Sequence, residues 1–101
     1  MIEVKRVETP GSLEFEAIVR DTKSETRHRV TMARETCERL TGGKFSPEQC
    51  VEAAFAFLLE REPKESILPR FDLTVISRYF PEFEREFPRY MQQLGKGDKC
   101  S

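Results

Sequence analysis

Histidine and cysteine are scarce in this chain. It has one histidine, His28, and three cysteines, Cys37, Cys50 and Cys100, without a CxxC spacing. A zinc site needs four Cys or His ligands at paired spacings, so we expect neither a metal nor another cofactor. The odd, unpaired cysteines favour reduced thiols that pack as small apolar residues. A nucleophilic pair of His28 with a cysteine is the catalytic alternative, but a lone histidine on an apolar strand face is more often packed.

Glycine motifs for phosphate are also missing. Gly42-Gly43-Lys44 and Gly95-Lys96-Gly97-Asp98 match neither GxxxxGKS/T nor GxGxxG after a strand. We interpret the first as a helix end and the second as part of a tail. Carboxylates are numerous, and an enzyme that uses buried carboxylates stays open because a sequence cannot show a polar cleft. The absence of a catalytic pattern nevertheless favours a non-catalytic protein.

No apolar run approaches the roughly 18–20 residues that span a bilayer, and Met1–Arg6 contains no stretch of signal-peptide length. We therefore expect a cytoplasmic protein without membrane association.

Charge is balanced, with 17 Lys+Arg against 18 Asp+Glu, and no third of the chain carries a large excess of either sign. The balanced net charge thus argues against strong non-specific nucleic-acid binding. It is still compatible with a local basic strand that contacts nucleic acid.

Residues 46–62 carry the strongest structural signal. Ser46 is a good N-cap, Pro47 suits the first helical position, and Gln49 completes a capping box. Pro63 ends the helix. The apolar arc is broad enough to need partners on more than one side. These features predict a central, buried helix, and the arc consists of Cys50, Val51, Ala53, Ala54, Phe55, Phe57 and Leu58.

Alternating patterns before this helix predict strands at residues 2–7, 13–20 and 26–32, the last two forming an antiparallel hairpin. We expect Glu14 and Glu16 to lie across from Arg29 and Arg27, where opposite charges stabilise the pairing.

A short helix at 33–41 should end at Gly42-Gly43. After Pro63 we expect a helical turn up to Pro69, a helix at 73–80 capped by Asp72, and a last helix beginning at Pro81 that Pro88 kinks or divides.

The predicted architecture is a single α+β domain at residues 1–94, with a disordered C-terminal tail at 95–101. An N-terminal antiparallel hairpin or small sheet packs against three to four helices around the central buried helix.

An aromatic surplus follows Pro69. The structural interpretation is that the rings pack on the second side of the core. The functional interpretation is an exposed apolar patch that binds a protein partner or forms a homodimer. The possible partner surface is Phe71, Tyr79, Phe80, Phe83, Phe87 and Tyr90.

Residues 27–62 combine an alternating strand (27–32), a helix with Arg34-Glu35 near its start, a glycine turn and a capped apolar helix. In this they resemble the ribbon-helix-helix family of bacterial DNA-binding proteins. The resemblance implies a twofold strand pair in the major groove, with Arg27, Arg29 and Thr31 facing the bases and the amides near Ser46 and Glu48 holding phosphate. A departure from the family is the strand at 13–20, which would occupy the edge that the dimer needs.

The stretch from Phe57 to Leu68, followed by Phe71-Asp72-Leu73 and Tyr79-Phe80-Pro81, resembles small uncharacterised bacterial protein families. This resemblance implies no site. We favour a non-catalytic cytoplasmic protein-interaction module, with a partner protein or a second copy as its ligand. A ribbon-helix-helix-type DNA-binding regulator is the alternative.

Overall fold

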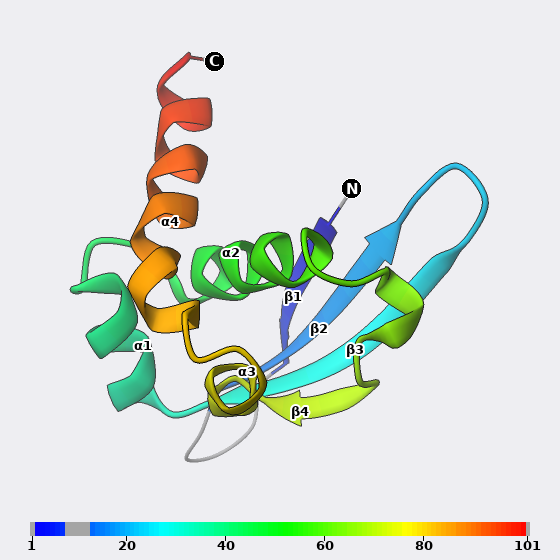
Figure 1. The fold of residues 1–101 in the computed structure, drawn as a ribbon. Helices are drawn as coiled ribbons and strands as arrows, with labels where there is room; N and C mark the ends of the chain where they lie inside the picture. The colour runs from blue at the N-terminus through cyan, green and yellow to red at the C-terminus, as the bar shows by residue number, and fades with distance from the viewer. Residues whose placement is uncertain (1, 8–12, 101) are drawn as a thin grey trace.

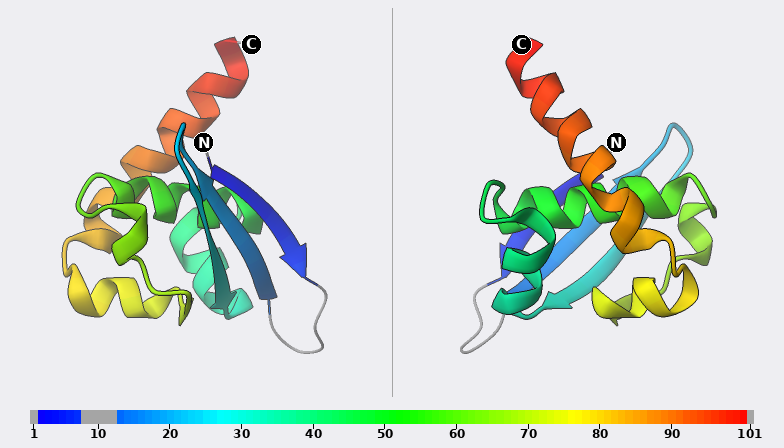
Figure 2. Two further views of the ribbon diagram at one scale, coloured as in Figure 1. Left: turned by 90° about the vertical axis from the view of Figure 1, so that its right-hand side faces the viewer. Right: turned by 60° about the vertical axis from the view of Figure 1, so that its left-hand side comes forward.

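The protein folds into two layers, a four-stranded sheet and a set of helices that covers one of its faces (Figures 1 and 2). The computed structural model describes residues 2–7 and 13–100, with side chains as far as Gln92. The predicted α+β class is confirmed. The elements in chain order are β1 (Ile2–Val7), β2 (Leu13–Arg20), β3 (Glu25–Met32), α1 (Arg34–Thr41), α2 (Pro47–Leu59), the 3₁₀ turn η1 (Lys64–Ser66), β4 (Arg70–Asp72), α3 (Thr74–Tyr79) and α4 (Phe83–Cys100).

The sheet has the order β1-β2-β3-β4, in which the first three strands are antiparallel and β4 runs parallel to β3. The expected charge pairing across β2 and β3 is only partly correct. Glu16 lies opposite Arg29, but the guanidinium of Arg29 reaches diagonally to Glu14. Arg27 lies opposite Ile18 and pairs with Glu25 of its own strand. The register is therefore shifted from the expected one, although it still places opposite charges together.

The strand β4 was not predicted. Its three residues are too few for a visible alternation, and the preceding Pro69 argues for a turn. The amide of Arg29 donates to the carbonyl of Pro69 at 2.8 Å, and the amide of Leu73 donates to the carbonyl of Thr31 at 2.9 Å. These long-range bonds recruit the segment into the sheet.

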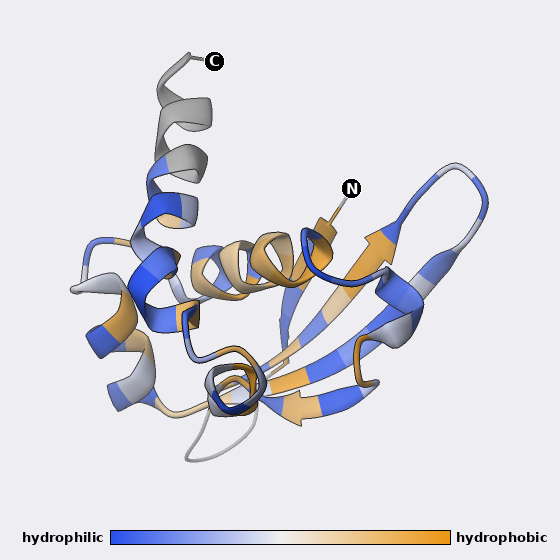
Figure 3. Ribbon diagram, viewed as in Figure 1, coloured by the Kyte–Doolittle hydropathy of each residue, from blue (hydrophilic) through white to orange (hydrophobic). Residues whose placement is uncertain are grey.

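The helix α2 is the centre of the core, as its sequence predicts. The Ser46 hydroxyl accepts from the Gln49 amide at 3.1 Å, and the Gln49 side chain accepts from the Ser46 amide at 2.9 Å, so the capping box is present. All seven residues of the predicted arc are buried. Figure 3 shows α2 as a largely apolar helix between the sheet and α4. Burial of each large side chain of this arc contributes about 1.5–3 kcal/mol.

The helix ends predicted from the sequence are confirmed in part. Gly42 takes the left-handed conformation after α1, with φ of 64°. Pro88 lies inside α4, which runs as one helix from Phe83 to Cys100 and so is not divided there. This helix includes residues 95–100, where composition predicts a tail, and the domain boundary at residue 94 stays a prediction.

The opposite face of the sheet carries no helix within the described residues (Figure 2). Alternate positions of the strands place charged side chains there, among them Glu16 and Arg29. A largely antiparallel sheet that is covered on one face is typical of small α+β domains.

Candidate functional site: an apolar groove beside α3

A groove of about 390 Å³ opens between the end of α2, the segment around η1 and the helix α3. We call it the α3 groove. It is lined by Leu58, Glu62, Ser66, Ile67, Leu68, Phe71, Val75, Ile76, Tyr79 and Phe80. Its volume lies within the range of about 300–1,000 Å³ found for ligand pockets. Most of its lining is apolar, so it can take apolar side chains or another apolar group.

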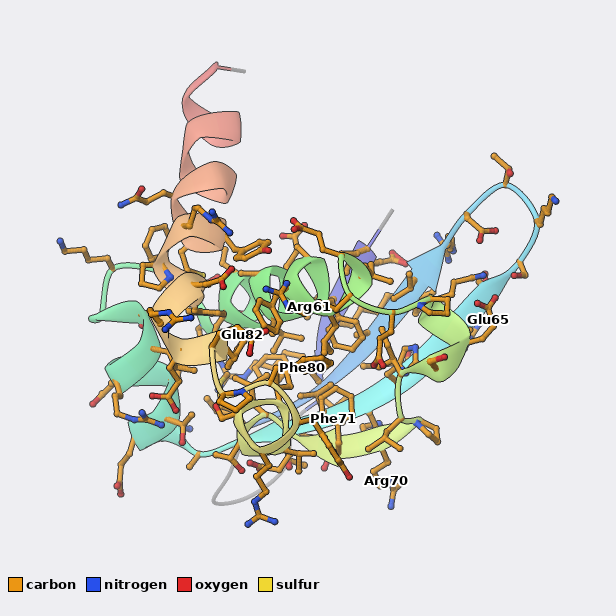
Figure 4. The ribbon with its side chains drawn as sticks, viewed as in Figure 1. Arg61, Glu65, Arg70, Phe71, Phe80 and Glu82 are labelled. Carbon is orange, nitrogen blue, oxygen red and sulfur yellow. The ribbon has the colours of Figure 1, made fainter. Side chains whose placement is uncertain are left out.

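The floor of the groove is continuous with the hydrophobic core. Phe71 packs against Phe55 with ring centroids 6.0 Å apart, and Phe80 packs edge-on against Phe57 at 5.8 Å. Figure 4 shows Phe71 and Phe80 between α2 and α3. Because the core rings hold both side chains, the floor is preformed rather than dependent on a ligand.

Two large apolar side chains on the rim are exposed to solvent. Tyr79 is 69 % exposed and Leu68 is 46 % exposed, and the other large apolar residues among those described are covered to a greater extent. Single exposed apolar residues are normal on a protein surface. Here both line the same groove, which makes this face the strongest candidate for binding.

The Leu68 side of the rim is fixed by His28. The Nδ1 atom of His28 lies 2.8 Å from the Leu68 carbonyl oxygen, which can only accept, so Nδ1 donates. The Nε2 atom lies 2.8 Å from the Thr26 hydroxyl, and the ring packs on Phe55 at 5.3 Å. His28 is thus a buried structural side chain, as the packed interpretation predicts.

The start of α3, the helix that carries Tyr79, is fixed by Asp72. One of its carboxylate oxygens accepts from the Thr31 hydroxyl at 2.8 Å, and the other accepts from the amide and hydroxyl of Thr74 at 3.1 and 2.6 Å. Partial burial by itself would raise the pKa of Asp72, but the hydrogen bonds from Thr74 and Thr31 outweigh it, and the pKa is lowered. Asp72 was predicted to cap this helix, but Leu73 occupies the N-cap position, and Asp72 instead accepts from the Thr74 amide at the first residue of α3.

The turn η1 is fastened to the sheet through Lys64. Its side chain is buried, and its ammonium group donates to Asp21 at 2.8 Å and to Glu65. Asp21 belongs to the β2–β3 turn, where it also accepts from the amides of Lys23 and Ser24. The hydrogen bonds to Asp21 and Glu65 raise the pKa of Lys64. A charged anchor therefore holds the third side of the groove.

The six aromatics predicted as a partner surface do not form one surface. Phe83, Phe87 and Tyr90 of α4 are buried in the core, and Phe83 packs edge-on against Phe57 at 5.0 Å. Phe71 is also buried but reaches the groove floor. Tyr79 and Phe80 remain at the groove. The core interpretation therefore holds for the four buried rings, and a partner surface at Tyr79 and Phe80 stays a prediction.

The residues predicted to contact DNA are engaged within the protein. Arg27 pairs with Glu25, Arg29 pairs with Glu14, and the Thr31 hydroxyl donates to Asp72. One edge of β3 pairs with β2 along its length, and residues 29–31 of the other edge pair with β4, which obstructs a twofold ribbon there. The DNA-binding hypothesis stays a prediction that these contacts do not favour.

Cys37 and Cys50 are buried free thiols. Burial, followed by the influence of Cys37, raises the pKa of Cys50 to about 12, which suppresses the thiolate that a nucleophile needs.

Among the described residues, no group of three His, Cys, Asp or Glu side chains could hold a metal ion. The same part of the chain contains no helix with the length and apolar character to cross a membrane.

Comparison of the chain with known proteins returns no matching family model, curated protein or solved structure.

Sequence reasoning missed the contribution of Leu58, Glu62, Ser66 and Leu68 to the groove. One signal was present in α3, where Val75 and Tyr79 are four residues apart and so share a helical face. Leu73, Ile76 and Phe80 share another face of this segment, and the first two are buried. The remaining lining comes from the end of α2, the segment around η1 and the strand β4, and these are brought together by tertiary contacts.

Proposed function

We propose that this protein is a non-catalytic interaction module that binds an apolar segment of another protein in the α3 groove. One observation carries the proposal: the two most exposed large apolar side chains of the described residues, Tyr79 and Leu68, lie on the rim of the same preformed hollow. Protein-binding sites are centred on apolar and aromatic anchors of this kind.

The shape of the site favours a partner protein over a second copy. A symmetric dimer joins the same patch from both copies, so it uses this groove only if a rim residue of one copy enters the groove of the other. A segment of a different protein can instead insert side chains into the groove. The proposal includes a reducing, cytoplasmic setting in a bacterium, which suits the free thiols of Cys37 and Cys50.

Site-specific photo-crosslinking in the native host tests the proposal. A photoreactive phenylalanine derivative replaces Leu68 in the full chain, and the control places it at Lys23, which is exposed in the β2–β3 turn. We expect a discrete adduct with another protein from position 68 alone, and its loss when Tyr79→Glu is added.

Three outcomes would overturn the proposal. They are the absence of an adduct from position 68, an equal adduct from position 23, and an adduct in which the protein is joined to itself. Sedimentation equilibrium of the purified protein checks the last outcome independently, because a homodimer would double the measured mass.

A further inference from the structure

One carboxylate in the α3 groove has no counter-charge among the described side chains. Of the described residues that line the groove, Glu62 alone is charged. It is half-buried just after α2, and no described side chain forms an ion pair or a hydrogen bond with it. We propose that the segment bound in the groove carries a lysine or arginine next to its apolar anchors, and that this cation pairs with Glu62. This inference rests on the proposed function and specifies the chemistry of the partner.

The nearest cations along the chain are committed elsewhere. Arg61 lies just after α2, where its guanidinium contacts Glu82 and Glu86 at 3.2 Å each and stacks over Phe57. Lys64 is held by Asp21 and Glu65. These two cations thus pair with other carboxylates, and among the described side chains none pairs with Glu62.

Because Glu62 lies in the groove, its charge affects which segments can bind there. An apolar segment that fills the groove removes water from the carboxylate, and an unpaired desolvated charge is costly. A lysine or arginine on the segment compensates that loss, and the lower local dielectric strengthens the pair. An acidic residue at the same place adds repulsion, so Glu62 discriminates between partners as well as attracting one.

The neighbouring Glu60 supplies a matched control. It lies two residues earlier, is exposed, and is outside the groove lining. Replacement of Glu60 or Glu62 by lysine changes net charge by the same amount. General electrostatic attraction therefore predicts equal effects at the two positions, whereas a specific pair in the groove predicts an effect at Glu62 alone.

Selection from a displayed library of random twelve-residue peptides provides the probe. The immobilised full-length protein, Glu62→Lys and Glu60→Lys are screened in parallel, after circular dichroism has shown that all three are folded. We expect peptides with a lysine or arginine beside aromatic or aliphatic residues from the unmodified protein and from Glu60→Lys. From Glu62→Lys we expect aspartate or glutamate at that place.

Affinities of one selected peptide complete the test. We expect Glu62→Gln to weaken binding roughly tenfold and Glu60→Gln to leave it within about twofold, as for a charge pair buried at an interface rather than one on its rim. Replacing the cation of the peptide by glutamine should cause the same loss in the unmodified protein and little further loss in Glu62→Gln.

The outcomes separate the two proposals. Apolar peptides without a preferred cation, bound equally by Glu62→Gln, would overturn the role of Glu62 and leave the groove as a docking site. A library that yields no peptide, or peptides that bind Tyr79→Glu as well as the unmodified protein, would overturn the docking site itself.

Discussion

Phe57 is the aromatic residue on which the packing of α2 against the C-terminal helices depends most. It is fully buried, and its ring makes edge-on contacts with Phe80, Phe83 and Tyr90 at centroid distances of 5.8, 5.0 and 5.7 Å. The guanidinium carbon of Arg61 lies 3.7 Å from the same ring centroid. The substitution Phe57→Ala removes all of these contacts at once and leaves a cavity between α2 and α4.

We expect Phe57→Ala to lower the free energy of unfolding by about 3–5 kcal/mol, the usual cost of truncating a buried phenylalanine. A domain of this size has a total of roughly 5–15 kcal/mol, so the variant should be marginal but measurable. With a urea dependence of about 2 kcal/mol/M, a loss of 4 kcal/mol moves the unfolding midpoint down by about 2 M.

Tyr79→Ala is the matched control, because it also removes an aromatic ring but from an exposed position. We expect a change within about 0.5 kcal/mol, or about 0.3 M in urea midpoint. Urea titration followed by far-ultraviolet circular dichroism measures both variants. Similar losses for Phe57→Ala and Tyr79→Ala would refute the division of the aromatics into core and groove.

Three further predictions concern charged and thiol groups. The pKa of Asp21 is lowered from 3.8 by the hydrogen bond from Lys64 and by two backbone amides, so its stabilisation is present above pH 3.8 and is lost as pH falls below it. Asp21→Asn should be less stable at pH 7 and show a shallower loss in acid, and urea midpoints between pH 7 and 2 that run parallel to those of the unmodified protein would contradict this. With the other two cysteines replaced by serine, Cys50 should react with a thiol reagent at pH 8 only on unfolding, and immediate reaction in the absence of urea would show that the thiol is accessible. Arg61→Lys keeps the charge but loses the planar guanidinium and its stacking on the Phe57 ring. We therefore expect urea titration to show a free energy of unfolding about 1–2 kcal/mol lower. An unchanged urea midpoint would show that a point charge suffices.

Local sequence signals determined the secondary structure around the core. The capping residues Ser46 and Gln49 and the terminating Pro63 act within a few positions of α2, so they are visible without any tertiary information. The same is true of the glycine after α1 and of the alternation in β2 and β3. Amphipathic period and capping are properties of neighbouring residues, and a sequence displays them directly.

The tertiary structure decided which of the aromatic side chains remain accessible. Phe83 and Tyr79 both follow helical spacing, yet one is buried against Phe57 and the other is on the rim of the groove. The groove itself depends on long-range contacts, namely the pairing of β4 with β3 and the bond from His28 to Leu68. Such contacts join residues about 40 positions apart, where periodicity carries no information. Their free energy comes from burial and hydrogen bonding that exist only once the two layers have packed.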